Sequence, residues 1–341
     1  MGTFIHAIEC YLPKAVLTNE QLSAEFPDWS VDKIAEKTGI YERHIAAEGE
    51  TAADLGVQSA LKLFELGHCK PEDIDFLLFC TQSPDYLLPT TACLIQDRLG
   101  LRKDCAAFDI NLGCSGYVYG LSIAKSMAQT NGFKKTLFIT AETYSRYIHK
   151  SDRSVRTLFG DGAAATLLTT SPDRNEAIGP FSFGTDGAGG KHLIVRAGGH
   201  REPGQAAEEG IGPQHLFMDG KEIFNFTLEI IPNLVNSILE KAQITRSEID
   251  YFVFHQANKF MLTSIQNKLK IPDELFCINM QKYGNTVSAT IPMALAKSMV
   301  DGMIKVGDRV MLVGFGVGTS WAATLITIEK EFLNGTSGVF E

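Results

Sequence analysis

The strongest constraint on the fold of this chain is an internal duplication. The tetrapeptide Ala-Lys-Ser-Met occurs twice, and matching segments flank both copies in the same order, at 74–79 and 249–254, 124–127 and 296–299, and 160–167 and 318–325. Ordered matches of this kind predict two half-domains built on one plan. Duplicated halves meet at a pseudo-twofold seam, where one site can take residues from both copies.

Each copy alternates short apolar runs with helical stretches. In the first copy we predict strands at 75–79, 106–111 and 136–140 and helices at 89–99 and 115–129. In the second copy we predict strands at 251–254, 276–279 and 310–314 and helices at 259–270 and 291–303. Such alternation favours α/β sheets covered by helices on both faces. Two of them back to back give a five-layer α-β-α-β-α fold, with an N-terminal half at 1–170 and a C-terminal half at 171–341.

Composition and charge narrow the class of protein. The net charge of −9 and pI near 5.5 argue against a nucleic-acid binder, whose surface would carry a basic stripe. No apolar run approaches the roughly 18 residues of a membrane span, and no secretion signal opens the chain. The seven cysteines form no C-x-x-C pair, which disfavours a zinc site or a disulfide framework. We therefore expect a cytoplasmic protein without a metal. We expect the polar tail at 329–341 to leave the fold and give it no role.

Cys114 is the candidate nucleophile. It lies between Gly113 and Gly116, where an apolar strand turns into a helix. The free N–H groups and positive dipole of a helix N-terminus can lower the pKa of a thiol from about 8.5 to about 3.5–7.5. Free cysteine is more often a small buried hydrophobe, and the other cysteines fit that role better.

Two polar residues in the second copy stand at comparable strand-to-helix loops. His255 follows the strand at 251–254, and Asn285 precedes the helix at 291–303, in a loop that aligns with the Cys114 loop. A histidine after a strand is usually structural, so only the seam raises His255 above the other histidines. Cysteine, histidine and asparagine in one pocket allow acyl transfer through sulfur, and cysteine proteases use the same residue types.

The chain closely resembles the β-ketoacyl-acyl carrier protein synthase III family of thiolase-fold condensing enzymes. The resemblance runs from about residue 5 to 328, on motifs at 11–13, 38–40, 42–47, 111–117, 159–163, 255–258, 284–286 and 314–318. It implies that Cys114 takes an acyl group from a thioester such as acyl-CoA. His255 and Asn285 would then bind the malonyl thioester of acyl carrier protein, which loses carbon dioxide and attacks the acyl-cysteine to give a β-ketoacyl product.

The resemblance also assigns supporting roles in the pocket. The backbone of Val317 would complete an oxyanion hole with Cys114, and Phe315 would exclude water. Leu88 stands where the family often has a phenylalanine that crosses a dimer interface into the acyl pocket. The smaller side chain predicts acyl groups longer or more branched than acetyl. Together with a longer aromatic and basic stretch at 141–159, it also predicts a homodimer, although that stretch equally suits a solvated loop.

The residues expected to contact CoA depart from the family pattern. The usual adenine-stacking tryptophan matches Lys33, with Trp29 nearby, while Arg153 is retained and Lys37 replaces an arginine. The segment that would line the pantetheine tunnel is matched at Gly220, Lys221 and Phe224. We hypothesise that the first acyl donor is a carrier-protein thioester instead of CoA. No tightly bound cofactor is expected.

A basic patch for the acidic carrier protein is predicted on one face of the helix at 259–270. It consists of Lys259, Lys268 and Lys270, although the usual arginine matches Phe260, and a solvated face is the simpler interpretation.

Several alternatives remain open. A synthase III-like enzyme of specialised lipid, quinolone or surface-glycan metabolism could transfer acyl groups without condensation. A cysteine hydrolase would release free acid without a malonyl donor, and a scaffold would form no acyl-cysteine. A degradative thiolase is disfavoured because the loop at 316–318 has no second cysteine. A hydroxymethylglutaryl-CoA synthase is disfavoured because no glutamate follows the strand at 75–79.

Overall fold

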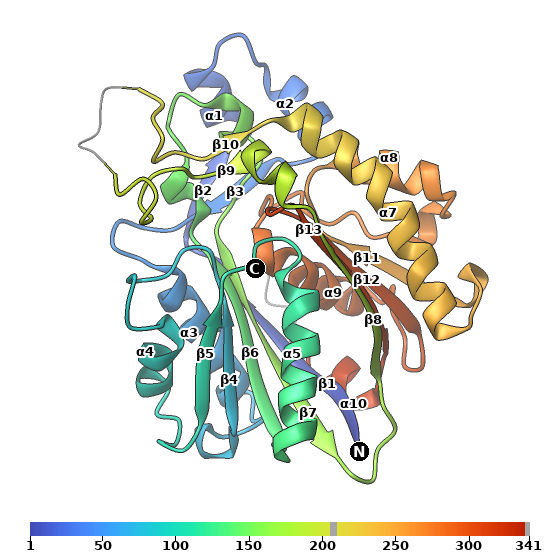
Figure 1. Ribbon diagram of the computed structural model, residues 1–341. Helices are drawn as coiled ribbons and strands as arrows, with labels where there is room; N and C mark the ends of the chain where they lie inside the picture. The colour runs from blue at the N-terminus through green and yellow to red at the C-terminus, as the bar shows by residue number, and fades with distance from the viewer. Residues whose placement is uncertain (205–209, 338–341) are drawn as a thin grey trace.

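Two β-sheets and three layers of helices make up the computed structural model, which describes residues 1–204 and 210–337 (Figure 1). The strand order is β1-β7-β6-β4-β5 in the first sheet and β11-β12-β13-β8 in the second. The predicted five-layer α/β fold is confirmed, since helices lie between the two large sheets and on the outer face of each (Figure 1).

The first sheet uses residues up to Ser171, and its elements and those inserted in it follow one another along the chain. They are β1 (Gly2–Tyr11), β2 (Ala15–Thr18), α1 (Asn19–Glu25), α2 (Val31–Thr38), β3 (Glu42–Ile45), α3 (Ala52–Glu65), η1 (Pro71–Asp73), β4 (Phe76–Cys80), α4 (Thr91–Arg98), β5 (Ala106–Ile110), α5 (Gly116–Asn131), β6 (Lys135–Glu142), η2 (Tyr144–Tyr147), α6 (Arg153–Arg156) and β7 (Gly162–Ser171).

The second sheet begins with β8, after a short connection. Its elements and those inserted in it are β8 (Ile178–Thr185), η3 (Gly187–His192), β9 (Leu193–Ile194), β10 (Phe217–Met218), α7 (Gly220–Ala242), η4 (Arg246–Glu248), β11 (Tyr251–Phe254), α8 (Lys259–Leu269), η5 (Asp273–Leu275), η6 (Val287–Ala289), α9 (Thr290–Val300), β12 (Arg309–Gly316), β13 (Ser320–Thr327) and α10 (Lys330–Asn334). The division near residue 170 places each sheet in its own half and stays our proposal for the domain boundary.

The duplication is visible in the pairing of the strands. In both sheets two strands pair in parallel (β4 with β6, β11 with β12), and the second of each pair is followed by an antiparallel strand (β7, β13). The first sheet has a further parallel strand, β5, at its edge. The prediction of a strand at 276–279 is wrong, because the chain there forms only an isolated bridge between Phe252 and Phe276.

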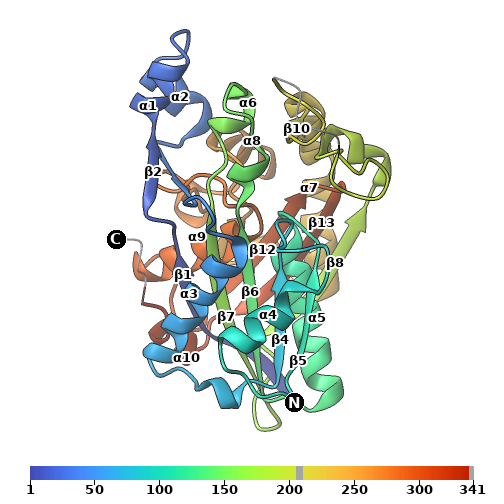
Figure 2. The ribbon, with the colours of Figure 1, turned by 90° about the vertical axis from the view of Figure 1, so that its left-hand side faces the viewer.

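Helices α5 and α9 form the middle layer, as the two views show (Figures 1 and 2). Their buried side chains share one core cluster with strands of both sheets. Helices α3 and α4 cover the outer face of the first sheet, and α7 covers that of the second with α8 packed beside it. Because α5 and α9 are apolar on all sides that touch a sheet, the middle layer excludes water from the seam.

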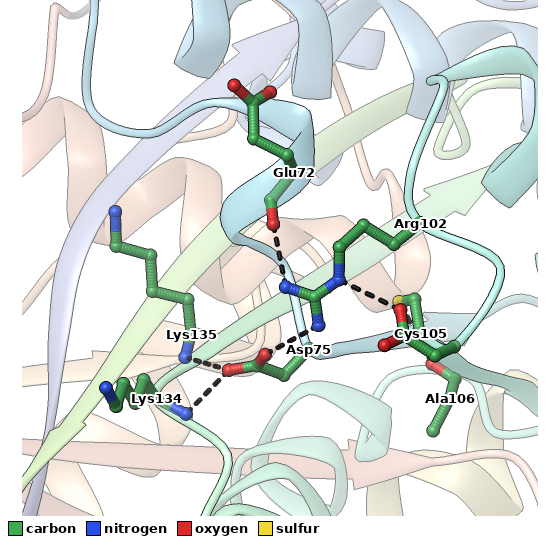
Figure 3. Close-up of polar contacts among 8 residues, drawn as sticks. Glu72, Asp75, Arg102, Cys105, Ala106, Lys134 and Lys135 are labelled. Atoms are coloured by element: carbon green, nitrogen blue, oxygen red, sulfur yellow. Dashed lines mark hydrogen bonds and ion pairs between the residues drawn. The ribbon is translucent and has the colours of Figure 1, made fainter.

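A matched pair of aspartates anchors the amino-terminal ends of the parallel strands. Asp75 Oδ2 accepts hydrogen bonds from the backbone N–H groups of Lys134 (2.7 Å) and Lys135 (3.2 Å), and its Oδ1 accepts from Arg102 (3.0 Å), as Figure 3 shows. In the second half, Asp250 Oδ2 accepts from the N–H of Arg309 at 2.7 Å. The repeated Ile-Asp dipeptide thus has the same structural role twice, at the end of the sheet opposite to Cys114.

The tail departs from the prediction that it leaves the fold. Helix α10 buries Phe332, and the backbone N–H and hydroxyl of Ser337 bond the buried carboxylate of Glu9 at 2.9 and 2.6 Å. An apolar contact and a charge-assisted hydrogen bond therefore hold the segment against β1. The last four residues, 338–341, lie outside the described part of the chain.

Candidate active site

Cys114 lies in a tight turn between β5 and α5. The N–H of Gly116 donates to the carbonyl of Gly113 at 2.8 Å, which closes a turn that contains the thiol. Strand β12 packs directly against it, since a Cβ added at Gly316 would stand 2.9 Å from Cys114 Sγ. Only glycine allows β12 to approach so closely. Cys114 is 5% exposed.

The thiol is not activated in the way that its helix position suggested. Burial, reinforced by the nearby Glu142 carboxylate, raises the pKa of Cys114 to about 12, although the backbone N–H groups of Cys114 and Val317 act in the opposite direction. The expectation of a lowered pKa is therefore wrong for the free protein. Desolvation of the anion outweighs a helix terminus because Cys114 is enclosed by both halves.

His255 stands at the end of β11 and is held as a neutral imidazole. Its Nδ1 lies 2.7 Å from the hydroxyl oxygen of Thr290, and its ring packs edge-on against Phe315 at a centroid separation of 5.5 Å. Burial lowers the pKa of His255 to about 3. A neutral ring can donate one hydrogen bond from Nε2 if Nδ1 is the acceptor.

Asn285 is fixed in orientation by its own loop. Its Oδ1 accepts the N–H of Val287 at 2.9 Å, which leaves both Nδ2 hydrogens available as donors. Val287 makes this bond in the left-handed region, with φ of 56°. A β-branched residue in that region is strained by about 1–3 kcal/mol. The strained conformation of Val287 therefore places its N–H where it fixes the orientation of the Asn285 amide.

A continuous series of contacts joins the three predicted residues. Asn285 bonds Val287, the hydroxyl of Thr290 lies 2.9 Å from the Val287 carbonyl, and Thr290 bonds His255. His255 then touches Phe315, whose neighbour Gly316 touches Cys114. The structure thus gathers Cys114, His255 and Asn285 at the carboxyl ends of the parallel strands.

A buried glutamate that the sequence analysis missed ties the two halves together behind the site. Glu142, at the end of β6, accepts hydrogen bonds from the Gln82 N–H (3.0 Å), the Ser83 hydroxyl (2.9 Å) and the Ser288 hydroxyl (2.9 Å). Burial raises the pKa of Glu142 to about 8 in spite of these donors. Its only sequence signal is one acidic residue that ends an apolar strand.

Helices α1, α2 and α6 lie at the same end of the molecule (Figure 2), and the predicted CoA residues Lys37 and Arg153 belong to α2 and α6. Trp29 carries Lys37 Nζ at 5.1 Å and Arg153 Cζ at 5.6 Å from its ring centroid. The aromatic ring beside Arg153 is therefore that of Trp29, in the loop before α2. Lys33, at the position aligned with the family tryptophan, supplies no ring. Gly220 and Lys221 are exposed at the start of α7, and Phe224 stacks on Phe260 at 5.2 Å.

The predicted basic patch is less regular than expected. Lys259, Lys268 and Lys270 are all exposed, but Lys268 Nζ donates to the Leu228 carbonyl at 2.8 Å and so points toward α7. Lys270 lies beyond α8 in the left-handed region, with φ of 52°. The prediction of one helical face therefore fails at its last member. Leu88 is 83% exposed on the connection between β4 and α4.

Two family models match the chain, described as 3-oxoacyl-[acyl-carrier-protein] synthase III at residues 108–187 and as the C-terminal part of the same synthase at 239–328. A β-ketoacyl-[acyl-carrier-protein] synthase III of Caldanaerobacter subterraneus subsp. tengcongensis is 37% identical over 320 residues, covering 94% of this chain and 96% of the relative. The chain belongs to the β-ketoacyl-acyl carrier protein synthase III family. The family predicted from the motifs is confirmed.

Solved structures of the synthase III family share the fold over nearly the whole chain. A 3-oxoacyl-(acyl-carrier-protein) synthase III at 2.1 Å superposes with a TM-score of 0.93 at 48% identity, covering 96% of this chain and 100% of that one. A synthase from Burkholderia xenovorans LB400 gives 0.91 at 36% identity, covering 98% and 96%.

The described residues contain neither a candidate membrane-spanning helix nor a candidate metal site. No described helix combines the length and apolar character needed to cross a bilayer. No group of three or more His, Cys, Asp or Glu residues in the described ranges could hold a metal ion.

Proposed function

We propose that this protein condenses an acyl thioester primer with malonyl-acyl carrier protein by decarboxylative Claisen condensation. The observation that carries the proposal is the contact series from Asn285 through Thr290 and His255 to Cys114. It gives one nucleophile and two neutral donors in a dry pocket. Neutral donors suit a reaction in which negative charge grows on a thioester oxygen.

The first half-reaction loads the cysteine. Cys114 Sγ attacks the thioester carbonyl of the primer, the oxyanion is bound by the N–H groups of Cys114 and Val317, and the carrier thiol leaves with the proton that Cys114 loses. The backbone donors that act on the Cys114 thiol support this assignment, because the carbonyl oxygen that becomes the oxyanion is bonded to the carbon that the sulfur attacks.

The second half-reaction forms the carbon–carbon bond. His255 and Asn285 donate to the malonyl thioester oxygen while carbon dioxide departs, and the resulting enolate attacks the acyl-cysteine carbonyl. The C–S bond then breaks, and the thiolate takes up a proton. Phe315, which is 2% exposed and touches the His255 ring, keeps water from the enolate.

We propose that the primer is delivered as a CoA thioester. Trp29, with the cationic groups of Arg153 and Lys37 beside its ring, forms an aromatic and cationic cluster suited to stacking on an adenine ring and contacting a phosphate. The hypothesis of a carrier-protein primer depended in part on the missing adenine-stacking tryptophan at position 33, and Trp29 beside Arg153 removes that reason. Gly220, Lys221 and Phe224 would line the pantetheine path, and Lys259, Lys268 and Lys270 would attract acyl carrier protein.

We also propose a homodimer in the cytoplasm. Strand β5 is a half-exposed edge of the first sheet, and the loop before α4 presents Tyr86, Leu87 and Leu88 to solvent, which together offer a twofold surface. All seven cysteines are free, as expected in a reducing compartment.

Intact mass spectrometry tests the proposal. The protein is mixed with a panel of acyl-CoA and acyl-carrier thioesters and then with malonyl-acyl carrier protein, and the Cys114→Ala variant serves as the control. We expect an acyl mass gain that depends on Cys114 and that malonyl addition discharges as a β-ketoacyl product. Discharge as free acid would instead indicate a hydrolase, and no adduct with any thioester would refute the proposal.

A further inference from the structure

A cavity of about 490 Å³ is lined by Val317, whose backbone N–H acts on the Cys114 thiol, and it is not wholly apolar. Its lining includes Leu193 and Leu216 and also the polar side chains of Gln82, Tyr144 and Tyr147. The amide of Gln82 lies against the nucleophile turn, because a Cβ added at Gly113 would stand 2.6 Å from Gln82 Oε1. The polar wall is therefore at the thioester end of the cavity.

The hydrogen bonds of this wall leave one donor group unused. The Tyr144 hydroxyl donates to Gln82 Oε1 at 2.6 Å, and the Tyr147 hydroxyl donates to the Gln82 backbone carbonyl at 2.8 Å. Each phenol has a single proton, so both are used. None of the side-chain hydrogen bonds of the described residues uses Gln82 Nε2, so its two N–H groups can serve a ligand in the cavity that Gln82 lines.

An unsubstituted alkyl chain would fit this wall poorly. It would displace water from the Gln82 amide without replacing its hydrogen bonds, which costs free energy. An oxygen on the chain would accept from the amide and avoid that cost. We propose that the primer of this protein is an acyl group with a neutral oxygen substituent, hydroxyl or keto, close to the thioester, and that Gln82 Nε2 selects it.

The surroundings of Gln82 favour a neutral oxygen over a carboxylate. Glu142 accepts the backbone N–H of Gln82 at 3.0 Å, directly behind the amide. Burial disfavours the charged form of every acid in this region, since it raises the pKa of Glu142 to about 8 and is the largest cause of the raised pKa values of Tyr144 and Tyr147. A carboxylate on the primer would meet the same desolvation.

The inference rests on the proposed function and names the substrate class of the same site. The test compares the initial rate of Cys114 acylation, by intact mass, for two matched primers, 3-hydroxybutyryl-CoA and butyryl-CoA, with acetyl-CoA alongside. We expect the hydroxylated primer to load roughly 10-fold faster or more, because a buried unpaired donor costs on the order of one decade or more in rate.

Two substitutions of the same kind locate the effect. Gln82→Leu should reduce the hydroxyl-to-alkyl ratio to near one, because leucine keeps the volume and removes the donors. Gln129→Leu is the matched control, since Gln129 is also half-buried but lies near the far end of α5, about 20 Å from the thiol at 1.5 Å per residue. It should keep the wild-type ratio. If Gln82→Leu does not fold, Tyr144→Phe removes the bond that orients the amide and should lower the ratio as well.

The outcomes separate this inference from the proposed function. Loading of butyryl or acetyl at least as fast as of 3-hydroxybutyryl overturns the inference and leaves the condensing function intact. An unchanged ratio in Gln82→Leu also overturns it. Acylation by no primer at all, CoA-linked or carrier-linked, overturns the proposed function and the inference with it.

Discussion

At the residue scale, the proton of Thr290 decides which nitrogen of His255 can act as a donor. The Thr290 hydroxyl oxygen lies 2.7 Å from His255 Nδ1 and 2.9 Å from the Val287 carbonyl, and one hydroxyl has only one proton to give. Donation to the Val287 carbonyl, at 2.9 Å, leaves the imidazole proton on Nδ1, whereas donation to Nδ1 leaves it on Nε2, so the proposed decarboxylation requires Thr290 to give its proton to His255 instead of to Val287. Thr290 is therefore a positioning residue for the proposed decarboxylation.

Substitution of Thr290 separates this role from simple packing. We expect Thr290→Val to lower the rate of malonyl decarboxylation about 10-fold to 100-fold, with little change in Cys114 acylation, because only the second step uses His255. Thr290→Ser should restore the rate. Equal losses in both half-reactions, or no rescue by serine, would indicate a packing role instead.

The lowered pKa of His255 predicts an unusual pH profile. A histidine with its ordinary pKa of about 6.5 would lose its neutral form between pH 7 and pH 5. Burial lowers the pKa of His255 to about 3, so we expect the ring to stay neutral over this interval. Malonyl decarboxylation by the Cys114→Ala variant, measured from about pH 5 to 8, should show no fall near pH 6.5. A tenfold loss with that midpoint would contradict the neutral donor.

Cys114 should behave as a thiol and not as a preformed thiolate in the free protein. Burial, aided by Glu142, raises its pKa to about 12. The rate of alkylation by iodoacetamide, measured by intact mass from about pH 7 to 9, should therefore rise close to tenfold per pH unit, since only the thiolate reacts. A plateau below about pH 8 would show that the helix terminus outweighs desolvation after all.

At the element scale, helix α5 brings the cysteine turn to the seam by packing closely on the first sheet. A Cβ at Gly120 would stand 2.0 Å from Phe138 Cζ on β6, and Tyr117 stacks on the same ring at 5.5 Å. The glycine is needed for close approach, since its φ is not in the left-handed region. The helix therefore cannot keep this position with a larger residue.

We expect Gly120→Ala to lower the free energy of unfolding by about 1–3 kcal/mol, as overpacked cores do. Chemical denaturation of the full chain measures this change. Gly187→Ala is the control, because a Cβ there meets nothing within 4 Å, and it should leave stability within about 0.5 kcal/mol. A neutral Gly120→Ala would show that α5 can shift without cost.

At the scale of the whole molecule, the loop before α4 exposes large apolar side chains that a monomer would leave in contact with water. Leu88 is 83% exposed, next to two further apolar side chains. Burial of such a patch across a twofold would remove it from water and place Leu88 at the partner's acyl cavity. The proposed dimer follows from this surface and from the open edge of β5.

Light scattering after gel filtration tests the dimer. We expect the wild-type protein to have twice the chain mass and Leu88→Arg to shift toward the monomer, because a charge would be buried at the interface. Leu66→Arg, at a leucine that is 52% exposed beyond α3, should remain dimeric. A monomeric wild type, or no difference between the two variants, would argue against this interface.

Local patterns in the sequence predicted most of the architecture and the three central residues. The strand-turn-helix signals around Cys114 and Asn285 are short-range, and the duplication placed both in equivalent loops. Helix ends were predicted within a few residues, since capping is also local. The strand at 276–279 failed because an apolar run does not reveal whether a neighbour is available to pair with it.

Only the tertiary structure decided the properties that depend on contacts between residues far apart in the sequence. Glu142 reaches Ser288 across 146 residues of sequence, and Trp29 meets Arg153 through a loop whose path no motif encodes. The pKa of Cys114 rises because the second half of the chain encloses it. The sequence by itself predicted the half-domain plan and the candidate nucleophile, through local propensity and repetition. Burial, donor orientation and the polar wall at Gln82 were decided only when the two halves packed together, because desolvation and hydrogen-bond geometry depend on every group around a site.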